Sequence, residues 1–207
     1  MKILSTLLLL GLPAAILLIG VMRGGRVLWI ALGALAAAAL GVLPFFGAER
    51  FGSMLDLSAG TGFFRLRLWQ SAWAMLRDHP WLGVGLDNFL YQYRTRYILP
   101  DAWQEPNLSH PHNLVLDFGT RLGVGGILVL LWLQVAFWSL AWRLYRRQAE
   151  GEARLLILGL MASMAAALAH GLLDNSFFLV DLAFIFFLTI GVIGKLANDM
   201  EKGQCVS

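Results

Sequence analysis

Long hydrophobic stretches alternate with shorter polar linkers along the chain. Five of them have the length of a membrane span, at residues 3–22, 27–46, 124–142, 155–174 and 177–196. A helix needs about 20 predominantly apolar residues to cross the hydrocarbon core of a bilayer. The pattern therefore predicts an all-α membrane protein with about five transmembrane helices, forming a single membrane domain over residues 1–207.

A more polar segment, residues 47–123, separates the second and third hydrophobic stretches. Four apolar residues in it recur at helical spacing: Leu66, Trp69, Trp73 and Leu76. Tryptophan on the apolar side with arginine nearby is typical of a helix that lies in the membrane interface. We expect such a helix over residues 64–77, ending before Pro80 because the residue before a proline avoids helical geometry.

The rest of this segment is predicted to contain a second short helix and the approach to the third span. The short helix is expected over Asp87–Tyr97, and a polar loop follows over residues 100–109. His110-Pro111-His112-Asn113 then begins a helix, because proline is favoured in the first helical turn. Three residues of that helix share a face with its histidine: Leu116, Gly119 and Gly123. Small residues on such a face allow close helix packing.

Basic residues in the short linkers predict the orientation of the spans. They occur between the first and second spans, between the third and fourth, and after the fifth: Arg23, Arg26, Arg143, Arg146, Arg147, Arg154, Lys195 and Lys202. These three places fall on one side of the membrane, which the positive-inside rule makes the cytoplasm. We therefore expect residues 47–123, with their interfacial helices, and the turn near residues 170–177 on the extracytoplasmic side of the inner membrane.

The same topology places the N-terminus outside. The apolar tract after Lys2 is interpreted as a retained helix, because no small-residue cleavage site precedes a polar mature chain. An odd number of helices upstream of Met1 is then expected, which would make residues 1–207 the C-terminal part of a longer fold.

The composition agrees with membrane embedding and excludes several classes of function. Apolar residues make up 58% and charged residues 14% of the 207 residues, whereas soluble domains are about half apolar and about a quarter charged. The formal charge of +3 is spread without a dense basic block, so no nucleic-acid partner is expected. The single cysteine, Cys205, excludes an internal disulfide and a cysteine-based zinc cluster.

His112 is the first candidate for chemistry in the outer segment. In the first turn of a helix, the positive end of the helix dipole disfavours the imidazolium form. A neutral imidazole can then act as a general base. The alternative is an interfacial histidine that only hydrogen-bonds the start of the helix.

Arginines in the outer segment provide a complementary function. A guanidinium group binds diphosphate oxygens in bidentate fashion and stabilises a departing anion. The candidate substrate-binding residues are three arginines and two polar neighbours of the candidate base: Arg67, Arg94, Arg96, His110 and Asn113. For most of the arginines, the alternative is a solvated or snorkelling side chain.

No metal site is predicted in the outer segment. His110 and His112 are near Glu105 and Asp117 in sequence, but this spacing matches no standard zinc pattern. The pair Asp174-Asn175, in the last outer turn, either lines the same cavity as the histidines or forms a polar turn between two spans.

Three blocks of residues form one pattern. The first is Arg65-Leu66-Arg67-Leu68-Trp69, and the second is His79-Pro80-Trp81-Leu82-Gly83-Val84-Gly85 followed by Asn88-Phe89. The third is His112-Asn113, nine residues, then Gly123-Val124-Gly125-Gly126. This pattern resembles the O-antigen ligase and polymerase superfamily of bacterial envelope glycosyltransferases, with its Arg, Trp, Pro-x-x-Gly-x-Gly and Phe blocks and its His-Asn, nine residues, Gly-x-x-Gly signature.

The resemblance implies a reaction and its participants. Members transfer a polyprenyl-diphosphate-linked glycan outside the inner membrane, with inversion at the anomeric carbon and without a metal ion or other cofactor. It implies that His112 activates the acceptor hydroxyl as a base and that Arg65 holds the diphosphate leaving group. The implied partners are the lipid-linked donor, membrane lipid, and an acceptor that is lipid A core, another glycan repeat unit or a protein side chain.

The chain departs from the family pattern in two respects. Members are usually longer and carry a further functional arginine in a Ser-Arg-Gly type motif. Its nearest match here, Arg23-Gly24-Gly25, is expected in a cytoplasmic linker, so that arginine is expected upstream or in a separate N-terminal partner chain. The second departure is Arg121, at a position where the family often has an acidic residue.

Two other classes of function are alternatives to glycan transfer. A transporter or channel would carry several ionisable residues within its spans, or broken helices near the midplane. The charges here lie mostly near the ends of the spans, which disfavours that class. A truncated, noncatalytic membrane module is the other alternative.

Overall fold

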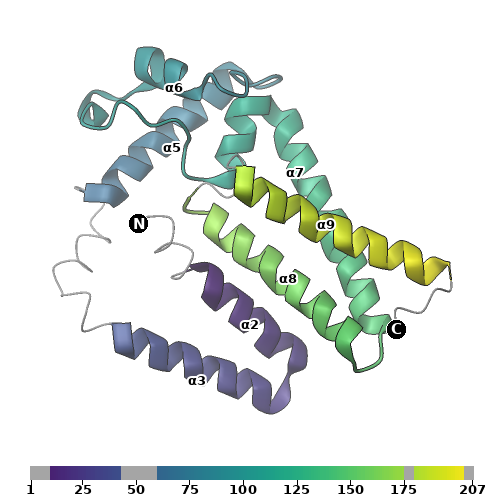
Figure 1. The fold of residues 1–207 in the computed structure, drawn as a ribbon. Coiled ribbons are helices and arrows are strands. Elements are labelled where there is room, and N and C mark those ends of the chain that lie inside the picture. Colours follow the sequence, from purple (N-terminus) through teal and green to yellow (C-terminus); the bar gives the residue numbers. More distant parts are fainter. Residues whose placement is uncertain (1–9, 43–59, 175–179, 203–207) are drawn as a thin grey trace. The chain divides into compact units, whose positions relative to one another are not determined.

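The computed structural model describes residues 10–42, 60–174 and 180–202, and all regular structure in these ranges is helical. In chain order the elements are α2 (Leu12–Arg23), α3 (Gly25–Val42), α5 (Gly60–Asp78), α6 (Phe89–Gln92), η2 (Tyr93–Tyr97), η3 (Pro100–Ala102), α7 (Leu114–Arg147), α8 (Glu152–Gly171) and α9 (Val180–Glu201). Figure 1 shows these helices as a ribbon. The predicted all-α class is confirmed for this part of the chain.

The chain divides into two compact units. Unit 1 comprises Met1–Ala36, Leu131–Gly171 and Ser176–Ser207. Unit 2 comprises Ala37–Leu130 and Leu172–Asn175, and the boundary between the units falls within α7. Every candidate site residue named above belongs to unit 2.

Three described helices are long and apolar enough to cross a membrane. They are Leu114–Arg147, Glu152–Gly171 and Leu182–Glu201. The first two apolar stretches form shorter described helices, Leu12–Arg23 and Gly25–Gly41. A helix of 12 residues, as in α2, rises only about 18 Å against a hydrocarbon core of about 30 Å. Parts of three predicted spans lie outside the described residues: 3–9, 43–46 and 177–179.

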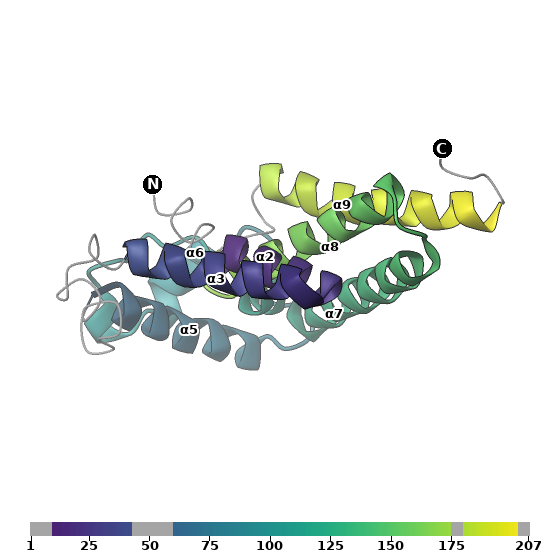
Figure 2. The same ribbon diagram turned by 90° about the horizontal axis from the view of Figure 1, so that it is seen from below.

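Within unit 1, α8 packs against both α2 and α9. The buried core of this unit includes Phe137 of α7, Met161 of α8 and Ile193 of α9. Helices α2 and α3 form a hairpin that is visible in both ribbon views (Figures 1 and 2). Gly20 permits the close approach, because a Cβ at this position would lie only 2.8 Å from the Cβ of Ala31.

The basic linkers of unit 1 meet at one end of its helices. Glu150, between α7 and α8, accepts Nη1 of Arg23 at 3.1 Å and Nη1 of Arg154 at 3.0 Å. Gln148 of the same linker donates to Sδ of Met200, near the end of α9, at 3.2 Å. Three linkers that the orientation argument assigns to one side are therefore in contact.

In unit 2, α5 corresponds to the helix predicted over residues 64–77. It begins earlier, at Gly60, and ends at Asp78 as expected. The residues of the predicted apolar pattern divide between two environments. Leu76 is buried, Trp73 is 62% exposed, and the face that packs against the protein also contains Leu68, Ala72 and Met75. This set contacts Phe89 and Tyr93. The apolar residues of this helix lie at helical spacing on two faces. Spacing alone does not show which of the two faces packs against the rest of the protein.

The predicted short helix over residues 87–97 is confirmed with a change of geometry. It runs as α-helix over α6 and continues as a π-helical turn over η2. Ser71 of α5 donates to the carbonyl oxygen of Tyr97 at 2.7 Å, and the Tyr97 hydroxyl donates to Asp78 Oδ2 at 3.1 Å. These bonds fasten the end of η2 to α5.

Helix α7 is interrupted at Gly123, whose φ of 70° and ψ of −161° are not helical. The turn after α5 satisfies the backbone groups that the interruption releases, because Val124 N–H donates to Pro80 O at 2.7 Å. Val84 N–H donates to Thr120 O, also at 2.7 Å. Gly123 does allow a close approach, but to the turn after α5 and not to another helix, since an added Cβ would lie 2.4 Å from Trp81 O. The predicted continuous face from His112 to Gly123 is therefore not formed, because the helix begins at Leu114 and is interrupted at Gly123.

Candidate functional site

The segment before α7 holds His112 in a defined backbone conformation. Asn113 is the N-cap residue, because its Oδ1 accepts Leu116 N–H at 3.0 Å and its carbonyl accepts Asp117 N–H at 2.8 Å. His112 precedes the cap and has a φ of 51°, in the left-handed region. The prediction that His112 lies in the first helical turn is therefore wrong: asparagine is a strong N-cap residue, so the helix begins at Leu114 and leaves the histidine outside.

Asp174 orients the His112 ring. His112 Nδ1 lies 2.8 Å from Asp174 Oδ1, and the aspartate side chain is only 5% exposed. An ionised carboxylate can only accept hydrogen bonds. With an ionised Asp174 and a neutral His112 ring, the contact places the ring proton on Nδ1 and the lone pair on Nε2. Of the two interpretations of Asp174 left open by the sequence, the structure favours the one that places it beside the histidines.

A second bond fastens the turn that carries Asp174 to the histidine segment. Asn113 Nδ2 donates to the carbonyl oxygen of Leu172 at 3.0 Å. The asparagine thus caps α7 with its oxygen and holds the 172–174 turn with its nitrogen. Both ends of the side-chain amide have a partner, which fixes its orientation.

Helix α5 contacts the histidine segment through Trp69. The indole Nε1 donates to the carbonyl oxygen of Pro111 at 2.9 Å. Arg65 lies four positions earlier on α5 and so shares a helix face with Trp69. Its side chain is half-buried and makes no hydrogen bond or ion pair with any residue that the structure describes. This guanidinium is therefore available for an anionic ligand one helical turn from the histidine contact.

His110 lies against His112, with ring centroids 4.2 Å apart. Its Nδ1 is 3.2 Å from the Ser109 hydroxyl. Burial lowers the pKa of the His110 imidazole to about 4, and His112 beside it acts in the same direction. One possible ligand atom each from His110, His112 and Asp174 lies within 4.8 Å of the others.

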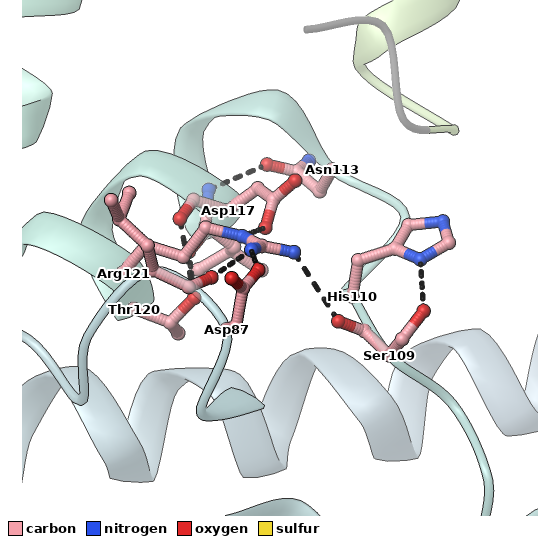
Figure 3. A network of polar contacts seen from close by, with 9 residues as sticks. Asp87, Ser109, His110, Asn113, Asp117, Thr120 and Arg121 are labelled. Carbon is pink, nitrogen blue, oxygen red and sulfur yellow. Dashed lines mark hydrogen bonds and ion pairs between the residues drawn. The ribbon is translucent and has the colours of Figure 1, made fainter. Parts of the chain in front are cut away.

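Arg121 joins the histidine segment to the loop after α5 (Figure 3). This buried side chain donates from Nε to Asp117 Oδ1 at 2.7 Å and from Nη1 to the carbonyl oxygen of Leu86. Its Nη2 donates to Ser109 O at 3.3 Å, and Asp87 lies 3.6 Å from Nη1. A guanidinium can serve these acceptors together because it has five N–H donors in a planar fork.

The other predicted substrate-binding arginines do not gather at the histidines. Arg67 pairs with Asp101 Oδ2 at 2.7 Å and donates to Gln70 Oε1 at 3.0 Å, which ties η3 to α5. Arg94 and Arg96 are exposed on η2 and form no ion pair within the described ranges. Among the candidates, the described contacts join His110, His112 and Asn113 in one cluster.

Sequence reasoning gave no role in the site to Trp69 or Arg121. The indole was assigned to a lipid-facing surface by its spacing, whereas its N–H bonds the histidine segment. The only signal for Arg121 was its spacing of four from Asp117, which is typical of an ion pair on a helix.

The family model described as O-antigen ligase matches residues 3–131, a range that contains Arg65 and His112 and ends before Asp174. The chain is 34% identical over 109 residues to an O-antigen ligase of Pseudomonas aeruginosa. That alignment covers 52% of this chain and 24% of the Pseudomonas protein, so the chain spans only part of this relative.

Proposed function

Because this chain belongs to the O-antigen ligase family, we propose that it transfers a glycan from a polyprenyl-diphosphate donor to an acceptor hydroxyl outside the inner membrane. Three apolar helices of spanning length support the membrane location. The contacts between the basic linkers of unit 1 support a common cytoplasmic side. This proposal includes five spans and an extracytoplasmic segment over residues 47–123, all within one membrane domain.

The contact between His112 and Asp174 carries the proposal. With Nδ1 donating to the carboxylate at 2.8 Å, Nε2 has the lone pair that a general base needs. The aspartate also stabilises the imidazolium that forms when the ring accepts a proton. A histidine oriented by a buried carboxylate is a recurring arrangement for removing a proton from a hydroxyl group.

The proposed reaction is a single displacement at the anomeric carbon of the donor. The acceptor oxygen forms a bond to that carbon, and its proton moves to Nε2 of His112. The bond between the anomeric carbon and the diphosphate oxygen breaks, and the electron pair leaves with the polyprenyl diphosphate. Attack from the face opposite the leaving group inverts the configuration, and the step needs no metal ion or other cofactor.

Arg65 is proposed to bind the diphosphate and to stabilise the charge that develops on it. A guanidinium group forms bidentate bonds to phosphate oxygens, which become stronger as negative charge accumulates. The half-buried position of Arg65 on the Trp69 face of α5, and its lack of a partner among the described residues, support this role. Arg94, Arg96 and the His110–Asn113 segment are proposed to bind the glycan or the acceptor.

The test is transfer of a labelled glycan from a polyprenyl-diphosphate donor, with the chain in proteoliposomes and with lipid A core, a glycan repeat unit or a peptide as acceptor. We expect His112→Ala and Arg65→Ala each to lower transfer by about 10² to 10⁴-fold, the usual contribution of a general base or of a charge-stabilising group. Matched controls are His79→Ala and Arg77→Ala, since Arg77 lies in the last turn of α5 and His79 follows its end, both far along the chain from Arg65.

The controls should retain transfer, and all four variants should insert in the membrane as the unchanged chain does. Full transfer by His112→Ala would remove the base assignment. No transfer by the unchanged chain to any of the three acceptors would overturn the proposed function.

A further inference from the structure

Three potential metal ligands meet at the histidine segment, and one of them is the proposed base, His112; the proposed reaction does not use them as metal ligands. His110, His112 and Asp174 each offer one ligand atom, and these atoms lie within 4.8 Å of one another. Two imidazoles and one carboxylate form a ligand set that suits Zn²⁺ and leaves further coordination positions open. The spacing of His110 and His112 in the sequence matches no standard zinc pattern, because the third ligand, Asp174, is 62 positions from His112.

We propose that His110, His112 and Asp174 bind a divalent transition ion, Zn²⁺ in the first instance, and that this ion inhibits glycan transfer. Inhibition, unlike metal binding, rests on the proposed function. The ion is an alternative occupant of the site and has no part in the transfer reaction.

The geometry needs only small adjustments to bind zinc. Ligand atoms about 2.0–2.1 Å from a tetrahedral ion lie about 3.3 Å from one another. His112 Nδ1 and Asp174 Oδ1 are 2.8 Å apart, so this pair would open slightly. The His110 ring, outside the helix and 4.2 Å from the His112 ring, would move toward them. All three residues belong to unit 2, so binding requires no rearrangement between the units.

Metal binding removes the base whichever nitrogen of His112 coordinates the ion. If Nδ1 binds, its proton moves to Nε2, and the neutral ring then has no lone pair for the acceptor hydroxyl. If Nε2 binds, the ion occupies that lone pair directly. When Nδ1 binds, Asp174 changes from a hydrogen-bond acceptor for His112 to a ligand of the ion. Ligation by Asp174 together with Nε2 would require the ring to turn over.

The binding test uses the full chain in detergent, purified without a histidine tag. Calorimetric titration with Zn²⁺ alone should show one site per chain, and Co²⁺ alone should produce the visible absorption bands of a bound ion. His110→Ala and Asp174→Asn should each weaken zinc binding by at least about 10-fold, since even outer groups around a metal contribute that much. His79→Ala, a histidine outside the cluster, should bind zinc as the unchanged chain does.

The second measurement is transfer by the unchanged chain with increasing Zn²⁺, followed by a chelator. Loss of transfer at the concentration that fills the site, with recovery after chelation, supports the inhibitory role. Unchanged zinc binding in both variants would overturn the site. Full transfer with the site filled would overturn the inhibition. Absence of transfer before any zinc is added would count against the proposed function alone, because the binding measurement does not depend on activity.

Discussion

His112 and Asp174 lie 62 positions apart in the chain, yet the Nδ1 of one is 2.8 Å from the Oδ1 of the other. Because the aspartate is buried, its negative charge stabilises the imidazolium more strongly than an exposed carboxylate would. We predict that Asp174→Asn lowers kcat by about 10²-fold or more, with little change in the KM for the donor. Steady-state transfer kinetics provide the measurement.

The paired variant Asp174→Ala separates charge from orientation. Asparagine can still accept a hydrogen bond from Nδ1 through its amide oxygen, whereas alanine cannot. We therefore expect kcat to be highest for the unchanged chain, lower for Asp174→Asn and lowest for Asp174→Ala. Asp199→Asn is the control, because among the described residues Asp199 pairs only with the exposed Lys195 of α9. Equal kcat for the unchanged chain and both variants would show that Asp174 does not position the base.

Asn113 performs two tasks that two substitutions can distinguish. Asn113→Asp keeps the oxygen that caps α7 but loses the N–H bond to Leu172 O, whereas Asn113→Ala loses both. Loss of an N-cap costs about 1 kcal/mol. We predict that only the alanine variant is less stable by about this amount in thermal unfolding. Both variants should loosen the 172–174 turn, which faster hydrogen exchange of its backbone amides would report.

If Asn113→Asp exchanges at the rate of the unchanged chain, the bond to Leu172 does not hold the turn. Asn88→Asp is a suitable comparison, because Asn88 also donates from Nδ2 to a carbonyl oxygen, that of Val84, within the loop after α5. Its exchange effect should be confined to the loop after α5.

The sequence predicted the helices of this chain better than its contacts. Hydrophobic length gave the approximate positions of α7, α8 and α9, and Pro80 gave the end of α5. These features depend on local chemistry, namely the apolar length of a span and the restriction that proline imposes. The preference of proline for the first helical turn predicts a start of α7 near Pro111. The helix begins later, at Leu114, because Asn113 caps it.

The candidate site depended on contacts between distant segments, which one sequence does not encode locally. His112 is a candidate from its position and from a family resemblance, whereas for Asp174 the sequence leaves two interpretations open and the folded chain decides between them. Trp69 was predicted to face lipid, since spacing describes an apolar ring and not the direction of its N–H. Arg121 departs from the family pattern, and the sequence gives no reason for an arginine at this position. The structure does, because the guanidinium donates to Asp117 and to the carbonyl oxygen of Ser109.

Arg121 should be a major determinant of the stability of unit 2. Its partner Asp117 is 1% exposed, and removing one member of a buried ion pair leaves the other charge without compensation. We predict that Arg121→Met destabilises the folded state by roughly 3–5 kcal/mol. The double variant Arg121→Met, Asp117→Leu should recover part of that loss, because it removes both charges.

Thermal unfolding of Arg121→Met, Asp117→Leu and the double variant in the same detergent measures this coupling. Exposed Arg94→Met is the control and should unfold with the unchanged chain. A double variant that is as unstable as the sum of its two single variants would show that Arg121 and Asp117 do not depend on each other. The carbonyl contacts to Leu86 and Ser109 would then account for the effect of Arg121.

Two glycines of α7, two positions apart, should respond to alanine in opposite directions. Gly123 has a backbone conformation that is essentially restricted to glycine, and an added Cβ would lie 2.4 Å from Trp81 O. Gly123→Ala should therefore destabilise the chain by at least about 1–3 kcal/mol and displace the turn that bonds Val124.

A Cβ on Gly125 would meet nothing within 4 Å, and this residue has helical geometry. Gly125→Ala should thus be neutral or stabilising by about 0.5–1 kcal/mol, since alanine loses less backbone entropy in a helix. Thermal unfolding compares the two variants, and a loss of stability equal for both would show that the interruption of α7 does not require a glycine.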